Sequence, residues 1–282
     1  MTTITRERPE HQSRPDRRRR PDRRRPDRLD RLAAGRAPGS AAGRLIRAEA
    51  RLMLRDPLTL TFVFAFPVVT MLIIGGSFGT TPAPAFDGVN PAHWYVASYL
   101  TVIIGAVGLV MLPVHLASYR ERGVLRRFAA AGFPRWSFAI AQLVIGLTVI
   151  AASAALLLAV AAPVYGVPPV THWGPMLAGL AAGSVLFVSL GVLLGSLLPS
   201  ARSAQATGLL LFFPSFLLGA GGPPPHVMGT ALQHVASVLP LTLVTNSVRV
   251  PWLGLGSAAG TLAEVIVLAV AACALAARRA AL

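Results

Sequence analysis

Six long apolar runs follow one another along this chain, separated by polar or turn-rich segments. They cover about residues 58–78, 96–118, 138–162, 176–198, 206–222 and 258–277. Each run, of which the fifth is the shortest, is close to the roughly 20 residues that an α-helix needs to cross a bilayer. The pattern therefore predicts an all-α polytopic membrane protein with six transmembrane helices.

Arginines in the connecting segments set the predicted orientation. They are concentrated after the second and fourth runs and at the C-terminus, in 119–137, 199–205 and 278–279. The segments on the other side, 79–95, 163–175 and 223–257, contain one Arg in all, Arg249. Cytoplasmic loops of membrane proteins are enriched in Arg and Lys. Both ends of the six-helix region are therefore predicted to face the cytoplasm.

The segment between the fifth and sixth runs is too apolar for an ordinary surface loop, yet Pro, His and Asn interrupt it. Residues 226–238 are predicted to form a short amphipathic helix that ends at Leu239-Pro240. Two short re-entrant helices that enter the outer leaflet explain this composition, provided that protein covers their irregular backbone. Within the second run, Pro113 is predicted to kink the helix.

The N-terminal region has a different composition. Residues 1–40 are predicted to be a disordered, Arg-rich cytoplasmic tail, because they contain too few apolar residues to offset the entropy of ordering. A solvated tail and attraction to anionic lipid headgroups both fit this composition. Nucleic-acid binding is disfavoured, because no aromatic residue is interleaved with the arginines.

An interfacial helix is predicted over residues 42–55, where four arginines at helical spacing lie opposite an apolar stripe. Glu49 falls inside the apolar arc of this helix. It is expected either to meet a partner or the 119–136 loop, or simply to be exposed.

Composition narrows the possible chemistry. The chain is 54% hydrophobic and 13% charged, about half the roughly 25% charge of soluble proteins. All 26 basic residues are Arg, so the chain lacks the Lys of a Walker A phosphate loop. The six His show no HExxH spacing, and no metal site is expected. The GxSxG string at 75–79 ends an apolar run, and it is interpreted as a helix terminus rather than as a nucleophile elbow.

Glu264 is the only acid inside a predicted membrane span. An ionisable group at such a position is a candidate for function. A structural hydrogen bond, a substrate or gating role, and proton coupling all remain open. An ion-coupled secondary transporter that uses Glu264 is the main alternative function, although such transporters usually carry more than one acid. A structural or sensory role also stays open, whereas no nucleophile–base pair supports an intramembrane enzyme.

Three stretches together resemble a known family. They are RDP at 55–57, ERGVLRRFAAAGFPRW at 121–136, and FFPSFLLGAGGPP at 212–224 followed by LPLTLVTNSVR at 239–249. Their order and their positions relative to the spans are similar to those in permease subunits of type-2 ABC transporters (ABC-2), a group that includes daunorubicin-resistance-type drug exporters. The resemblance covers roughly residues 40–280, and it implies an ABC-2 type transmembrane domain over residues 41–282. The chain departs from the family pattern at PPPHVMG, where the family commonly has an acid.

The resemblance implies a transport subunit without catalysis of its own. It would bind no cofactor, and ATP-Mg would be held by a separate cytoplasmic ABC ATPase. A second permease copy, in a homodimer, and membrane lipids would be the other partners, with no nucleic acid. The expected location is the bacterial cytoplasmic membrane, and the expected cargo is a drug-like, antibiotic or lipid-like molecule.

The resemblance also implies two sets of site residues. The first set would couple the chain to the ATPase, and it comprises Glu121, Arg122, Gly123, Val124, Leu125, Arg126, Arg127, Phe128 and Glu49. The second set would line a pathway or gate between two copies, near spans two and five, and it comprises Phe212, Phe213, Pro214, Phe216 and Glu264. Ordinary packing or lipid contact would account for the aromatic residues equally well.

Overall fold

A computed structural model describes residues 60–124 and 135–281. All described residues belong to one compact unit of the chain. The predicted tail, the predicted interfacial helix and Glu49 lie outside the described residues, and so do Leu125, Arg126, Arg127 and Phe128.

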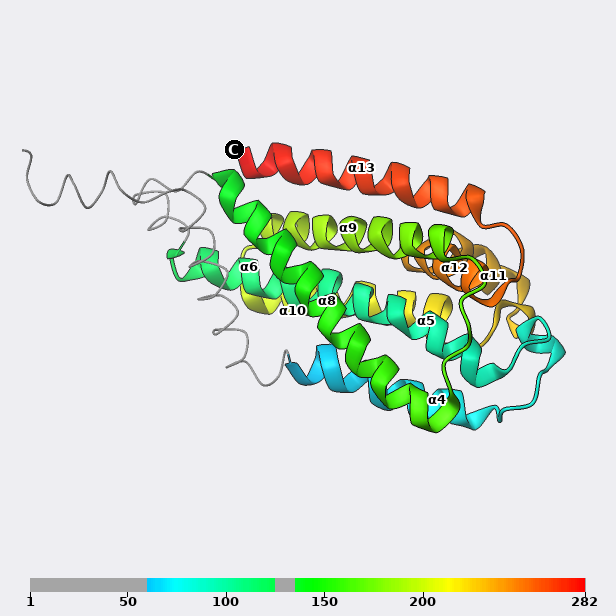
Figure 1. Ribbon diagram of the computed structural model, residues 1–282. Helices are drawn as coiled ribbons and strands as arrows, with labels where there is room; N and C mark the ends of the chain where they lie inside the picture. The colour runs from blue at the N-terminus through cyan, green and yellow to red at the C-terminus, as the bar shows by residue number, and fades with distance from the viewer. Residues whose placement is uncertain (1–59, 125–134, 282) are drawn as a thin grey trace, which may run out of the picture. The chain divides into compact units, whose positions relative to one another are not determined.

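The described part of the chain is helical and contains no β-strand (Figure 1). Its longer elements are η1 and α4 (Thr61–Ala65, Phe66–Ser77), α5, η3 and α6 (Pro91–Gly105, Ala106–Met111, Leu112–Glu121), α8 (Arg135–Tyr165), α9 (Trp173–Leu197), α10 and η4 (Ala201–Ser215, Phe216–Ala220), α12 (Pro240–Leu253) and α13 (Ala259–Ala281). Three short elements complete it: η2 (Pro84–Phe86), η5 (Pro225–Val227) and α11 (Thr230–Val238).

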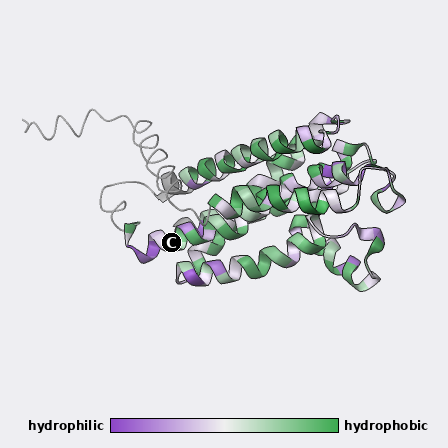
Figure 2. Ribbon diagram, turned by 90° about the horizontal axis from the view of Figure 1, so that it is seen from below, coloured by the Kyte–Doolittle hydropathy of each residue, from purple (hydrophilic) through white to green (hydrophobic). Residues whose placement is uncertain are grey.

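Five helical segments among the described residues are long and apolar enough to cross a membrane, and a shorter apolar helix covers Thr61–Ser77. These six lie where the six apolar runs are, so the prediction of an all-α polytopic membrane protein is confirmed. Hydrophobic residues follow the length of the helices, whereas hydrophilic residues gather toward helix ends and loops (Figure 2). The number of spans that cross the membrane and their orientation remain predictions.

Several helix ends differ from the predicted ones by a few residues. The second run begins earlier, at Pro91, because the Asn90 side chain accepts a hydrogen bond from the Ala92 amide and so caps the helix. The fifth begins at Ala201, where Ser200 and Ser203 form a reciprocal capping box. Capping of this kind depends on side-chain geometry that hydropathy does not report.

The segment after η4 contains the two short helices that the sequence predicts. α11 ends at Val238 and α12 begins at Pro240, as expected from Leu239-Pro240. α12 is fixed at its far end, where the amides of Thr171 and His172 donate to the carbonyls of Trp252 and Pro251. The indole of Trp252 also donates to the Pro168 carbonyl, at 3.0 Å. The loop that precedes α9 therefore holds the end of α12.

α9 packs against helices on several sides, and glycines allow the closest approaches. A Cβ at Gly179 would lie 2.6 Å from the Ser247 carbonyl oxygen of α12. A Cβ at Gly195 would lie 2.7 Å from the Leu116 Cβ of α6. One glycine pair of α9, Gly179 and Gly183, therefore faces α12, and a second pair, Gly191 and Gly195, faces η3 and α6.

The helices contain π-helical turns next to prolines. η1 precedes Pro67, η3 precedes Pro113, and η4 follows Pro214. Proline has no N–H to donate to the carbonyl four residues earlier, and a π-turn is one way in which a helix accommodates this. At Pro67 that carbonyl belongs to Val63, and the buried Ser153 hydroxyl of α8 donates to it at 2.8 Å. The irregularity expected near Pro113 takes the form of η3.

The GxSxG string lies at the end of α4. The helix ends at Ser77, and Gly79 has a φ of 76° in the left-handed region that suits glycine. The Ser77 hydroxyl donates to the Ile73 carbonyl of the preceding turn. The interpretation as a helix terminus is confirmed.

Candidate functional site

The charged segment after the second span begins where α6 ends. α6 ends at Glu121, the Gly123 amide donates to the Arg120 carbonyl, and Gly123 has a φ of 66°. A left-handed glycine is the common way for a chain to leave a helix. Glu121 and Arg122 are exposed, and Gly123 and Val124 are half-buried. The first residues of the predicted coupling set are therefore available to a partner at this helix end.

Arg120 connects the end of α6 to the end of α9. Its Nη1 donates to the carbonyls of Gly195, Ser196 and Leu198, at 3.2, 2.5 and 3.1 Å. The last carbonyls of a helix have no partner within the helix and carry its negative dipole end, so a guanidinium is favoured there. The sequence shows Arg120 only as one more loop charge, and nothing in its spacing points to α9.

The predicted gate residues divide between the interior and the surface of the protomer. Phe212 and Phe216 are buried and stack in parallel, with centroids 5.8 Å apart. Phe66 and Tyr99 pack edge-on against Phe216. Phe213 packs against Phe62 and Phe66 but is 40% exposed, and the next residue, Pro214, is exposed as well. Of these four residues of span five, only Phe213 and Pro214 are open to a second copy or to a cargo in this protomer.

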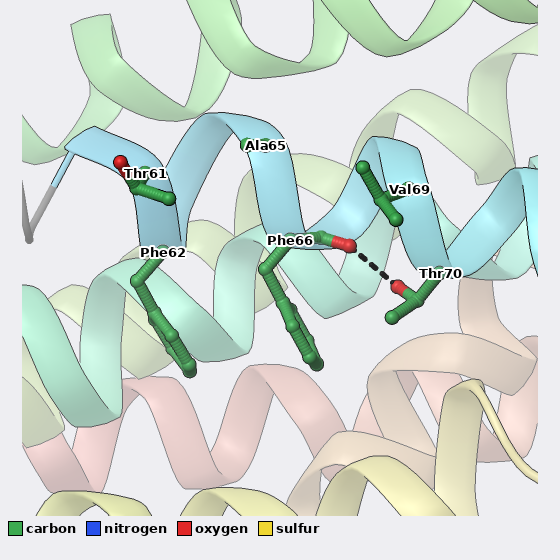
Figure 3. Close-up of a pocket in the computed structure, with 6 residues that line it drawn as sticks. All are labelled: Thr61, Phe62, Ala65, Phe66, Val69 and Thr70. Atoms are coloured by element: carbon green, nitrogen blue, oxygen red, sulfur yellow. Dashed lines mark hydrogen bonds between the residues drawn. The ribbon is translucent and has the colours of Figure 1, made fainter.

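A shallow apolar groove of about 360 Å³ lies beside this cluster. It is lined by Thr61, Phe62, Ala65, Phe66, Val69 and Thr70 of η1 and α4. Phe62 and Phe66 project side by side into it, and the Thr70 hydroxyl donates to the Phe66 carbonyl (Figure 3). The exposed ring of Phe213 lies 6.5 Å from Phe62 and 6.2 Å from Phe66. The groove and α10 therefore form one apolar surface.

The second span is enclosed by the other helices. In the most apolar stretch of this span, 89% is buried within the protomer. The corresponding value for α10 and η4 is 33%. A pathway lined by both spans two and five would therefore need the helices around span two to move. In this conformation, α4 and α10 provide the exposed aromatic surface.

Arg249 is the buried cation of the described residues, and the sequence shows it only as the single Arg of an apolar segment. It lies on α12 and is 4% exposed. Its guanidinium carbon lies 3.7 Å from the centroid of a Trp94 ring, its Nη2 donates to Asn246, and its Nη1 donates to Ser98. A cation that lies over an aromatic face and donates to two polar side chains can stay charged inside a protein.

The contacts around Arg249 join α12 to α5. The hydroxyls of Thr101 and Thr245, both buried, lie 2.7 Å apart. The Tyr95 hydroxyl donates to the Gly222 carbonyl just after η4. This buried polar contact positions α12 and the turn after η4 against the second span.

Glu264 lies in the second turn of α13 and is exposed. Its neighbours on the same side of the helix include Val267, which is 67% exposed. None of the buried residues described by the structure is an Asp or a Glu. The described ranges also contain no cluster of three His, Cys, Asp or Glu that could hold a metal ion.

These observations define a class of protein: a multi-pass α-helical membrane protein with a charged turn at the end of one span and an apolar, aromatic surface along others. A family model for ABC-2 type transporters matches residues 41–252. The chain belongs to this family and is a permease subunit of an ABC transporter. Membership in general implies a separate ABC ATPase partner. Neither the curated proteins nor the solved structures provide a match to the chain.

Proposed function

We propose that this chain is the membrane subunit of an exporter of the bacterial cytoplasmic membrane. It moves a drug-like, antibiotic or lipid-like molecule and is powered by ATP-Mg bound and hydrolysed in a separate ATPase chain. The family match over 41–252 carries this proposal. The low charge of the membrane spans favours an apolar or amphipathic cargo.

The ATPase docks at the charged segment that starts where α6 ends. Glu121 and Arg122 are exposed there and offer both signs of charge to a partner. Charge pairs across an interface set partner choice and register. Gly123 turns the chain at this point, and Val124 adds an apolar contact; Leu125, Arg126, Arg127, Phe128 and Glu49 belong to the same proposed interface.

Two copies of the chain form the pathway between them. The surface made by the groove and by Phe213 is apolar and aromatic, and aromatic residues are enriched in protein interfaces. Of the predicted gate, Phe213 lies on this surface, and the neighbouring Pro214 is exposed as well. The buried Phe212 and Phe216 support this surface indirectly, because their ring contacts fix the position of α10 and η4 against η1 and α4.

Affinity purification of the tagged chain in mild detergent, followed by mass spectrometry, tests this function. The expected result is a P-loop ATPase at about one copy per chain. Reproducible absence of such a partner from the intact membrane protein would contradict the proposal.

A charge reversal tests the docking site. Glu121→Arg is expected to abolish transport and to lower the amount of co-purified ATPase, while membrane insertion stays intact. Arg202→Glu is the matched control, because Arg202 is also exposed and lies in the first turn of α10. Normal transport by Glu121→Arg would exclude this residue from the coupling interface.

A further inference from the structure

Arg120 occupies a position that the coupling interface alone does not explain. It immediately precedes Glu121, the first residue of the proposed docking segment. Its guanidinium, however, points away from a partner and toward α9, where one nitrogen contacts three carbonyls of Gly195, Ser196 and Leu198. A side chain held by the protomer in this way is not free to bind the ATPase.

The contact bridges two helix ends of like polarity. α6 and α9 both end here, at Glu121 and at Leu197. The carbonyls at the end of α9 carry partial negative charge, and the positive guanidinium that α6 supplies is favoured there. Arg120 is thereby a link between the end that receives the ATPase and a second membrane helix.

Packing between the two helices makes this link stiff. Gly195 lies against Leu116, one turn before Arg120, and a Cβ at Gly191 would lie 2.5 Å from the Gly108 carbonyl oxygen of η3. Helices at such close approach cannot slide without steric clash. Toward its other end, α9 lies equally close to α12 through Gly179 and Gly183. A displacement of α6 at its end is therefore carried to α9, which contacts the α12 helix directly.

From this geometry we infer that Arg120 is a positioning residue for transport, which transfers motion of the docking segment to α9. The inference rests on the proposed function, because it supposes an ATPase at Glu121. Arg120 itself touches neither cargo nor ATP. Its loss leaves the ATPase bound but weakens the connection between the docking segment and α9, because the helix packing further along α6 is then the remaining link.

The experiment compares Arg120→Gln, Arg120→Lys and the wild type, each purified with its ATPase and reconstituted into liposomes. The measured quantity is the number of cargo molecules transported per ATP hydrolysed, normalised to intact complex. Because coupling between sites commonly corresponds to factors of about 5–150, Arg120→Gln is expected to lower this ratio about tenfold. Arg120→Lys keeps a positive donor that can reach the carbonyls, and it is expected to recover most of the ratio. Arg202→Gln is the control and should match the wild type.

A purely structural role predicts a different result. It would lower the yield of folded complex and leave the ratio per complex unchanged.

Amide hydrogen exchange gives a second readout. Arg120→Gln should speed exchange in the last turn of α9, residues 194–198, because the carbonyls there lose their cap.

The possible failures can be told apart. An unchanged transport ratio in Arg120→Gln, within twofold of the wild type, would overturn the role of Arg120 while the proposed function stands. Failure of the wild-type chain to co-purify with any ATPase would instead refute the proposed function, and this inference with it.

Discussion

Two arginines, one at the end of α9 and one on α12, which packs near the start of α9, show how differently one residue type can act in this protein. Arg120 is exposed and binds only backbone carbonyls at a helix end. Arg249 is buried and binds an aromatic ring and polar side chains. An exposed cation at a helix end typically contributes less than about 1 kcal/mol to stability. A buried cation costs several kcal/mol in desolvation, so its partners must compensate for it.

The comparison implies a division of roles. The contact around Arg249 holds α12 on α5. The contact of Arg120 contributes little to stability, so its proposed role is to couple the docking segment to α9 rather than to hold the fold together.

Truncating Arg249 should be the most damaging change. Arg249→Ala removes the cation, leaves Asn246 and Ser98 without their donor, and opens a cavity. These effects together are expected to lower the free energy of unfolding by about 3 kcal/mol. Thermal unfolding in detergent measures the loss. Arg249→Met keeps most of the volume without a charge and should recover part of the stability; a loss below about 1 kcal/mol in the alanine variant would show that the buried contact is dispensable.

A side chain added where α9 and α12 pack most closely should have the second-largest effect on stability. A Cβ at Gly179 meets the Ser247 carbonyl oxygen, and backbone cannot move aside as a flexible side chain can. Gly179→Ala is expected to cost about 2 kcal/mol in unfolding free energy, the usual scale for overpacking. Gly260→Ala serves as the control, because a Cβ there has no neighbour within 4 Å among the described residues. Equal melting temperatures for the two variants would contradict the close packing of these helices.

A double-mutant cycle isolates the aromatic part of the buried contact. Arg249→Met, Trp94→Leu and the double variant should show a coupling energy of about 1–2 kcal/mol, as expected for a desolvated cation–π pair. The measurement is again thermal unfolding. Additive effects would mean that the ring contributes burial alone.

Losing the Arg120 cap should have the smallest effect on stability. Arg120→Gln is expected to lower the free energy of unfolding by about 0.5 kcal/mol, because the carbonyls it leaves can bind water at an exposed helix end. The same thermal assay applies. A loss above about 2 kcal/mol would move Arg120 into the same structural category as Arg249 and would weaken the division between the two arginines.

The amino-acid sequence by itself determined the class of this protein. Long apolar runs require helices in a membrane, because a lipid environment leaves no other partner for backbone groups. The Leu239-Pro240 punctuation located the junction between α11 and α12. The order of short motifs pointed to the ABC-2 family, which the family match confirms. Each of these features depends on residues near one another in the chain.

Only the tertiary structure decided which side chains act together. Phe212 and Phe213 are adjacent in sequence, yet the rotation of α10 buries the first and exposes the second. Arg120 and Arg249 look alike as isolated charges, but one reaches carbonyls more than 70 residues away and the other lies over a ring more than 150 residues away. Hydropathy patterns cannot reveal such pairings, because membrane helices are apolar on nearly all sides. Their packing depends instead on close van der Waals contacts at small residues and on hydrogen bonds between helices.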